Sequence, residues 1–276
     1  MSDNPLVNHF RKVEVYIPLP SKGKYYPEKL ETSVDDEIGI YPMTVKDEIE
    51  IKSADSLYNG EALYHMISSC VPSIKDPKNM PVCDVDPILL GIRYASYGKE
   101  VDLNMTCQKC EELNQFSVSV QDMLGRIQPM TSEDTVTLED NTVIHIVPYM
   151  LKHRVQTSVQ NSKNRQLMLV LNNANKSDEE KKEIYNRTIV EQSLLLTDLV
   201  SQCIKKVVLE DGTEVDNPVF IKEWVENINR KTYDILNDAI GKLSQTRVNK
   251  QVQGKCNSCG SDIHSSLEID PFSFFT

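Results

Sequence analysis

Two pairs of cysteines have the spacing that most clearly indicates chemistry in this sequence. Each pair follows the pattern Cys-x-x-Cys, first at Cys107 and Cys110 and again at Cys256 and Cys259. This spacing lets both thiolates of a pair turn toward one point, and two pairs supply the four ligands of a tetrahedral Zn²⁺. A site closed by four thiolates leaves no position for water or substrate, so the predicted zinc is structural and not catalytic.

Other uses of these thiols stay open as alternatives. A single Cys-x-x-Cys near a βαβ pattern is typical of a thioredoxin-like redox centre, although no helix start is predicted at Cys107 to lower its pKa. Unliganded thiols are the other alternative. Gly260 follows the second pair and suits a tight knuckle turn, whereas Glu111 follows the first. His264 is a further conceivable ligand, but four thiolates already suffice.

Strand-like stretches flank both cysteine pairs. VDLNMT and QFSVSV surround the first pair, and KQVQGK and SSLEID surround the second. The sequence therefore predicts two β-hairpins that together form a split zinc ribbon from residues 100–125 and 245–270. Structural zinc binding is worth roughly 10–16 kcal/mol in small peptides, so one ion could hold these distant segments together.

The rest of the chain favours an α+β fold, with a mostly helical body and short antiparallel strands. Thr44 and Asp47 fit a capping box at a helix start. Asp86 and Pro87 suit the N-cap and first position of another helix. The predicted segments are an extended N-terminal arm at 1–33, a small α/β segment at 34–99, a mainly helical insertion at 126–244 and an aromatic tail at 271–276.

Two further predictions concern the insertion. A helix should begin near Ser177, where Ser177 and Glu180 fit a second capping box, and continue to about Val208. Asp211 and Gly212 then predict a type I′ turn in a hairpin.

Composition argues against several classes of function. The chain of 276 residues has a mean hydropathy of −0.39 and no apolar run long enough to span a membrane. The N-terminus lacks a secretory signal, which favours a reducing cytosolic setting. The formal charge of −11 disfavours nucleic-acid binding. No HExxH, GxSxG or P-loop motif occurs, so we expect no enzymatic activity.

Aromatic residues and prolines mark both ends of the chain. The segment from Phe10 to Pro27 reads either as a strand on its own domain or as an arm that docks on a neighbouring chain. The candidate partner-binding residues are Phe10, Tyr16, Pro18, Pro20, Tyr25, Tyr26, Phe272, Phe274 and Phe275.

Several stretches taken in order resemble one known family. They are FRKVEVYIPLPSKGKYYP, YPMTVKDEI, NGEAL, SCVPSIKDP, MPVCDVDPILLGIRYASYG, the two cysteine pairs and the terminal DPFSFF. Together they are similar to the baseplate hub proteins of T4-like contractile-tailed bacteriophages, a family that includes hub subunits and hub-assembly factors.

The resemblance implies a non-enzymatic structural protein of the virion tail baseplate, made in the host cytoplasm. Its partners would be other hub and tail proteins, with the tape measure protein as one candidate. An assembly chaperone absent from the mature virion is the alternative within the family. A zinc-ribbon regulator that binds nucleic acid is the alternative from another class.

Overall fold

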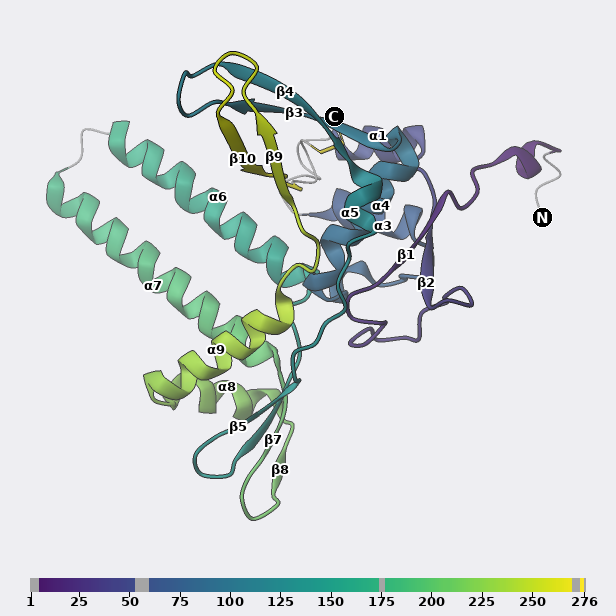
Figure 1. Cartoon of the computed structure of the whole chain (residues 1–276). Coiled ribbons are helices and arrows are strands. Elements are labelled where there is room, and N and C mark those ends of the chain that lie inside the picture. Colours follow the sequence, from purple (N-terminus) through teal and green to yellow (C-terminus); the bar gives the residue numbers. More distant parts are fainter. Residues whose placement is uncertain (1–4, 53–59, 174–176, 270–273, 276) are drawn as a thin grey trace. The chain divides into compact units, whose positions relative to one another are not determined.

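The structure is a computed structural model that describes residues 5–52, 60–173, 177–269 and 274–275. The fold is α+β, with eight α-helices and short antiparallel strands among the described residues, as the sequence predicts (Figure 1). The chain divides into two compact units. Unit 1 combines residues 1–130 with 246–276, and unit 2 consists of residues 131–245.

Unit 1 begins with a small sheet on a helical core. β1 (Val15–Pro18) pairs antiparallel with β2 (Glu37–Ile40), and both strands contact α4 (Val82–Tyr97). α1 (Val45–Ile51) and α3 (Glu61–Cys70) complete this part, together with the short 3-10 turns η1 (Pro5–His9) and η2 (Pro77–Asn79). The capping box of Thr44 and Asp47 is confirmed at the start of α1.

The start of α4 corrects one prediction. The helix begins at Val82 after Pro81, and Pro87 lies inside it, so Asp86 is not its N-cap. Asp86 is buried and binds Lys250, with Oδ2 and Nζ 2.9 Å apart. A carboxylate held by an ion pair elsewhere does not cap the helix. Pro87 lies in the second turn, where it has no N–H to donate to the Cys83 C=O. The helix ends at Tyr97, and Gly98 is its C-cap with a φ of 96°.

Two β-hairpins form the rest of unit 1. β3 (Glu100–Thr106) pairs with β4 (Leu113–Ser119), which leads into α5 (Val120–Leu124). β9 (Gln251–Lys255) pairs with β10 (Asp262–Ser266). The hairpins pack face to face, because Gly254 of β9 leaves room for the Phe116 ring of β4. The salt bridge between Lys250 and Asp86 ties the chain before β9 to α4.

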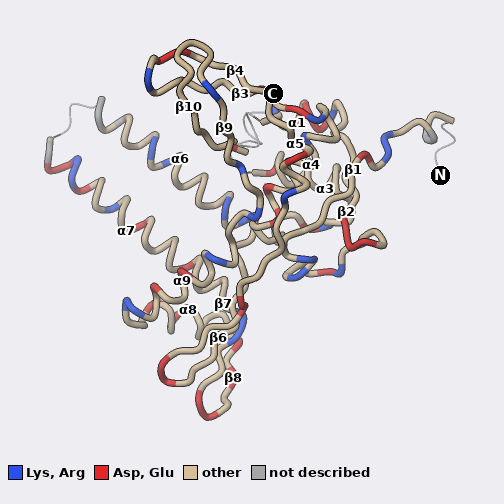
Figure 2. Tube along the Cα trace, in the orientation of Figure 1, with Lys and Arg blue, Asp and Glu red and all other residues tan. Residues whose placement is uncertain are grey.

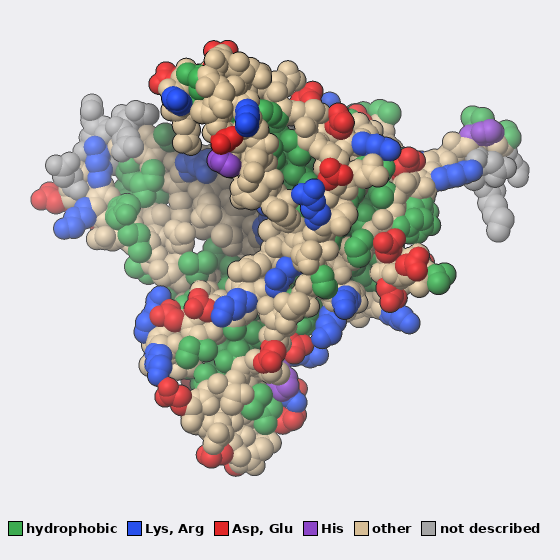
Figure 3. All heavy atoms as spheres, in the orientation of Figure 1, with side chains coloured by type: hydrophobic (Ala, Val, Ile, Leu, Met, Phe, Trp, Pro, Cys, Tyr) green, Lys and Arg blue, Asp and Glu red, His purple; other side chains and the backbone are tan. Residues whose placement is uncertain are grey.

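Unit 2 contains a four-stranded antiparallel sheet in the order β5-β6-β7-β8. Its helices carry apolar residues, and on the visible face of α6 and α7 these gather on the surface (Figure 3). Figure 2 shows Lys and Arg but no Asp or Glu along α6. The elements are β5 (Thr135–Thr137), β6 (Val143–Ile146), α6 (Leu151–Asn173), α7 (Asp178–Gln202), β7 (Ile204–Val208), β8 (Glu214–Val215), α8 (Pro218–Asn227) and α9 (Arg230–Ser244).

Two predictions in unit 2 are wrong in detail. The helix that Ser177 caps ends at Gln202, and residues 204–208 form β7, because Val207 and Val208 pair with β6. The β7–β8 turn is not type I′, because only Gly212 has a positive φ, of 83°. The Gly212 N–H donates to Leu209 C=O, and the Leu209 N–H to Thr213 C=O. This is the three-residue loop whose left-handed position glycine fills.

Candidate metal centre

The four paired cysteines meet at one point in unit 1. Their Sγ atoms all lie within 4.8 Å of one another. Cys107 and Cys259 are 3.7 Å apart, and Cys110 and Cys256 are 3.5 Å apart, measured between sulfurs. Sulfurs bound to one tetrahedral Zn²⁺ at about 2.3 Å would be about 3.8 Å apart. The cluster therefore has nearly the dimensions of a zinc site, and its sulfurs are too far apart to be disulfide-bonded.

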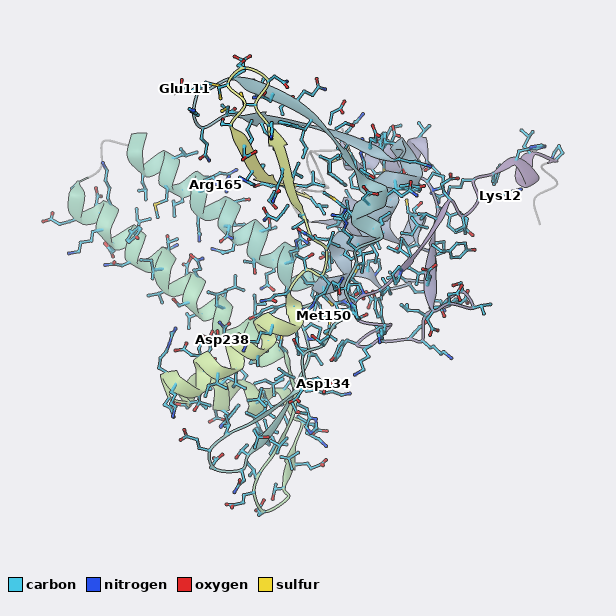
Figure 4. All side chains as sticks on the ribbon, viewed as in Figure 1. Lys12, Glu111, Asp134, Met150, Arg165 and Asp238 are labelled. Atoms are coloured by element: carbon cyan, nitrogen blue, oxygen red, sulfur yellow. The ribbon has the colours of Figure 1, made fainter. Side chains whose placement is uncertain are left out.

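The two knuckles have the same backbone hydrogen bonds. The Glu111 N–H donates to Cys107 C=O at 2.9 Å, and the Gly260 N–H donates to Cys256 C=O at 2.9 Å. Glu111 has a φ of 58° and Gly260 a φ of 69°, so both occupy the left-handed region. Figure 4 labels Glu111 at the tip of the first hairpin. Glu111 therefore adopts the same left-handed backbone conformation as Gly260 in the second knuckle. For a residue with a side chain, this conformation costs roughly 1–2 kcal/mol.

Asn114 joins the first hairpin to the second knuckle. Its side chain is 1% exposed, and Nδ2 lies 3.6 Å from the Cys256 sulfur. Its Oδ1 accepts the backbone N–H of Asn257 at 2.8 Å. Sequence reasoning missed Asn114, because an asparagine on a strand has no distinctive pattern. A residue that hydrogen-bonds to a metal ligand from behind fixes the orientation of that ligand, here Cys256.

Ser261 places a hydroxyl beside two of the sulfurs. Its Oγ lies 3.2 Å from Cys107 Sγ and 3.0 Å from Cys259 Sγ. The hydrogen bond from Ser261, with the backbone N–H groups of Lys109 and Cys110, lowers the pKa of Cys107 to about 6. Ser261 also lowers the pKa of Cys259. Because the thiolate is the form that binds metal, these contacts favour coordination.

The chemistry of the donors fits zinc. Four thiolates in a tetrahedral arrangement select zinc or iron–sulfur centres over hard cations such as Mg²⁺ or Ca²⁺. Cys107 and Cys256 are buried, whereas Cys110 and Cys259 are exposed at the hairpin tips. His264 is exposed and does not belong to the four-sulfur cluster.

The other cysteines lie apart from this centre. Cys70 and Cys203 are fully buried, and desolvation raises the pKa of each to about 12. Cys83 is buried inside α4. Such thiols are inert.

The predicted partner-binding residues of the N-terminal segment fall into two groups. Phe10 is 58% exposed, Tyr16 is 52% exposed, and Pro18 is also exposed. Pro20 is buried and Tyr25 is half-buried. The Tyr26 hydroxyl donates to Asp84 Oδ2 at 3.0 Å. The segment therefore forms part of unit 1 from β1 onward, and Phe10 and Tyr16 present large aromatic surfaces.

The C-terminal aromatic residues lie against their own unit. Phe274 is 6% exposed and Phe275 is 4% exposed, and the Tyr97 hydroxyl donates to Phe275 C=O at 3.0 Å. Phe272 lies outside the described residues. Rings covered in this way are not presented to a partner in this structure.

Two hairpins whose knuckles bring four thiols together define the chain as an α+β protein with a split ribbon that could hold a metal ion. No helix within the described ranges has the length and apolar character to cross a membrane. The family model described as T4 bacteriophage base plate protein matches residues 12–276, so the chain belongs to this family. The match confirms the resemblance to T4-like baseplate proteins. Comparisons with curated proteins and with solved structures found no match.

Proposed function

We propose that this protein is a structural subunit of the baseplate hub of a contractile-tailed phage, clasped by one zinc ion and without catalytic activity. The observation that carries the baseplate role is the family match across residues 12–276. The building-block role is supported by a metal centre whose four thiols would leave no open coordination position.

Zinc would stabilise unit 1 by joining its two halves. Cys107 and Cys110 belong to residues 1–130, and Cys256 and Cys259 belong to residues 246–276. Metal affinity in such a site becomes folding free energy. A domain is stable by only about 5–15 kcal/mol, so a bound zinc would be a large part of the stability of unit 1.

The N-terminal segment would provide an attachment to other hub or tail proteins. Exposed aromatic residues are favoured interface anchors, and Phe10 and Tyr16 meet that description. Arg11 holds the base of the segment, because Nη1 lies 2.6 Å from Pro42 C=O and Nη2 lies 2.8 Å from Ser69 C=O. The same guanidinium pairs with Asp47 at 3.3 Å.

The test is a deletion that stops before Arg11. Removing residues 1–10 should leave a folded, metal-binding chain that no longer joins the baseplate hub in an assembly assay. The control is the single variant Lys12→Ala, which changes an exposed residue just beyond the deletion and should assemble normally. Normal assembly of the deleted chain would show that these residues are not the attachment.

Mass spectrometry of purified tails separates a hub subunit from an assembly chaperone. A subunit is present in the finished particle, whereas a chaperone is missing. Titration with DNA and RNA at low salt tests the regulator alternative, which the charge of −11 disfavours. Tight, salt-dependent binding would contradict the structural role.

A further inference from the structure

A groove in unit 1 follows the edge of β3 that does not face β4. Its volume is about 610 Å³, and its walls come from β3, the end of β10 and the side chains of Arg93, Ser117 and Phe274. The groove lies apart from the four sulfurs and from the N-terminal segment. Both walls of the groove contain strand backbone.

The register of the first hairpin shows which backbone groups face the groove. Hydrogen bonds from Val120 N–H to Lys99 C=O and from Cys107 N–H to Glu112 C=O bracket β3. In an antiparallel pair these bonds alternate along the strand. The odd-numbered residues of β3 therefore bond to β4, and the N–H and C=O groups of Glu100, Asp102 and Asn104 point outward.

These outward groups form no backbone hydrogen bond with any residue in the described part of the chain. An exposed row of this kind is a ready template for another strand. The other wall of the groove also presents outward backbone groups. The Leu267 N–H donates to Lys250 C=O, so in the alternating pattern the N–H and C=O groups of Ser266 and Glu268 face away from β9.

The side chains along β3 indicate what the added strand would carry. Glu100 and Asp102 are exposed on one face of the ribbon, and Glu268 lines the opposite wall. Val101, Leu103 and Met105 lie on the other face. A strand added beside β3 would place alternate side chains next to the carboxylates and next to the apolar residues.

We propose that the β3 edge groove binds an extended segment of another protein that alternates Lys or Arg with apolar residues. The segment would pair with the outward backbone of Glu100, Asp102 and Asn104. Main-chain hydrogen bonds would supply affinity, and the alternating charge would supply specificity.

The experiment uses the purified full chain with zinc and a short fluorescent peptide of alternating Lys and Val. A second peptide of alternating Glu and Val has the same strand propensity and the opposite charge. Binding is followed by fluorescence anisotropy. We expect the basic peptide to bind at least about tenfold more tightly than the acidic one, a difference of about 1.4 kcal/mol.

Two proline variants separate the groove from the rest of the ribbon. Asn104 and Gln115 are cross-strand neighbours, and their N–H groups point to opposite edges of the hairpin. Asn104→Pro removes one outward donor from the β3 edge, and Gln115→Pro removes one from the β4 edge. We expect Asn104→Pro to weaken binding of the basic peptide about tenfold or more. Gln115→Pro also removes the hydrogen bond from Gln115 Nε2 to Asp102 Oδ2, but the freed carboxylate can still pair with the peptide, so binding should stay close to that of the wild type.

Several results would overturn the proposal. They are no binding of the basic peptide, equal binding of both peptides, and equal loss in both proline variants. Sedimentation of the chain without peptide, which measures self-association, can give a further contradicting result. If the chain self-associates through an interface that Asn104→Pro abolishes, the occupant is a second copy of the chain and not a basic partner. Because these measurements need no assembled tail, their failure would leave the hub role untouched.

Discussion

Phe116 of β4 lies directly against Gly254 of β9, and a Cβ atom at Gly254 would come within 2.1 Å of the ring. The two hairpins approach this closely only because position 254 has no side chain. The contact is distinct from the sulfur cluster, but it lies between the same two hairpins.

Gly254→Ala should therefore push the hairpins apart. Overpacking of this kind typically costs about 1–3 kcal/mol, and we expect weaker zinc binding together with lower thermal stability. Gly125→Ala is the control within unit 1, because its nearest contact would be an ordinary 3.6 Å. Equal metal affinity and stability in Gly254→Ala and the wild type would contradict a tight contact. Competition with a zinc chelator and thermal unfolding measure the two effects.

The strain at Glu111 leads to a second prediction. Glu111→Gly should stabilise the first knuckle by about 0.5–1 kcal/mol, since the relief of left-handed strain exceeds the entropy cost of glycine. Gly260→Ala should destabilise the second knuckle by about 1 kcal/mol. The two variants form a reciprocal pair, and unfolding of the zinc-bound chain in urea measures both. A loss of stability in Glu111→Gly would show that the glutamate side chain has a role of its own.

Metal content tests the centre itself. We expect one zinc ion per chain and a strong loss of it in both Cys107→Ser and Cys256→Ser, although the two residues lie in different hairpins. His264→Gln should retain the metal. Elemental analysis of the purified variants gives the stoichiometry, and a charge-transfer band after cobalt exchange reports thiolate ligands. Retention of zinc by Cys107→Ser would rule out the four-thiolate site.

His153 in unit 2 predicts a loss of stability in mild acid. Desolvation, together with Lys152, lowers its pKa to about 4, and it is 3% exposed. Nδ1 accepts the Met150 N–H, and Nε2 faces Gln202 Oε1 at 3.2 Å, so the neutral ring fits the site. The unfolded chain binds the proton more readily, so stability is complete above about pH 6.5 and falls toward pH 4.

Protonation of His153 lowers the free energy of unfolding by at most about 3 kcal/mol. Trp224 on α8 is the single tryptophan of the chain, and its fluorescence reports on unit 2. Urea unfolding at pH 7 and pH 5 should show the loss in the wild type and much less of it in His153→Gln. Asp198 also faces His153 and favours its charged form, but this effect is smaller than desolvation. An identical pH response in the variant would rule out His153 as the cause.

Asp84 in unit 1 predicts the opposite response. Desolvation raises its pKa to about 6, although its hydrogen bonds from Ser21 and Tyr26 act in the other direction. The folded state binds the proton more tightly, so this group contributes stability at low pH that is lost as pH rises through about 6. Hydrogen exchange of unit 1 peptides at pH 5 and 7 should show this trend, and Asp84→Asn should flatten it. Stronger protection at pH 7 that Asp84→Asn abolishes would contradict the sign.

Sequence reasoning found the sulfur cluster because thiol spacing is a local pattern with few chemical explanations. It also found the helix start at Thr44, where the cap and its partner lie three residues apart. It failed at β7, because residues 204–208 become a strand only through pairing with β6. It failed at Asp86, whose partner Lys250 is remote in the sequence. It missed Asn114 because an asparagine on a strand has no distinctive pattern, and it missed the contact of Ser261 with Cys107 because the two residues are remote in the sequence.

The separation of the two knuckles has a consequence for biosynthesis. Unit 2 lies between them in the chain, so the ribosome must complete all of residues 131–245 before the second pair of thiols is made. During that interval Cys107 and Cys110 can offer an ion only half of its ligands. Closure around the metal is thus postponed until Cys259 has been made, and a product terminated before that residue could never complete the site.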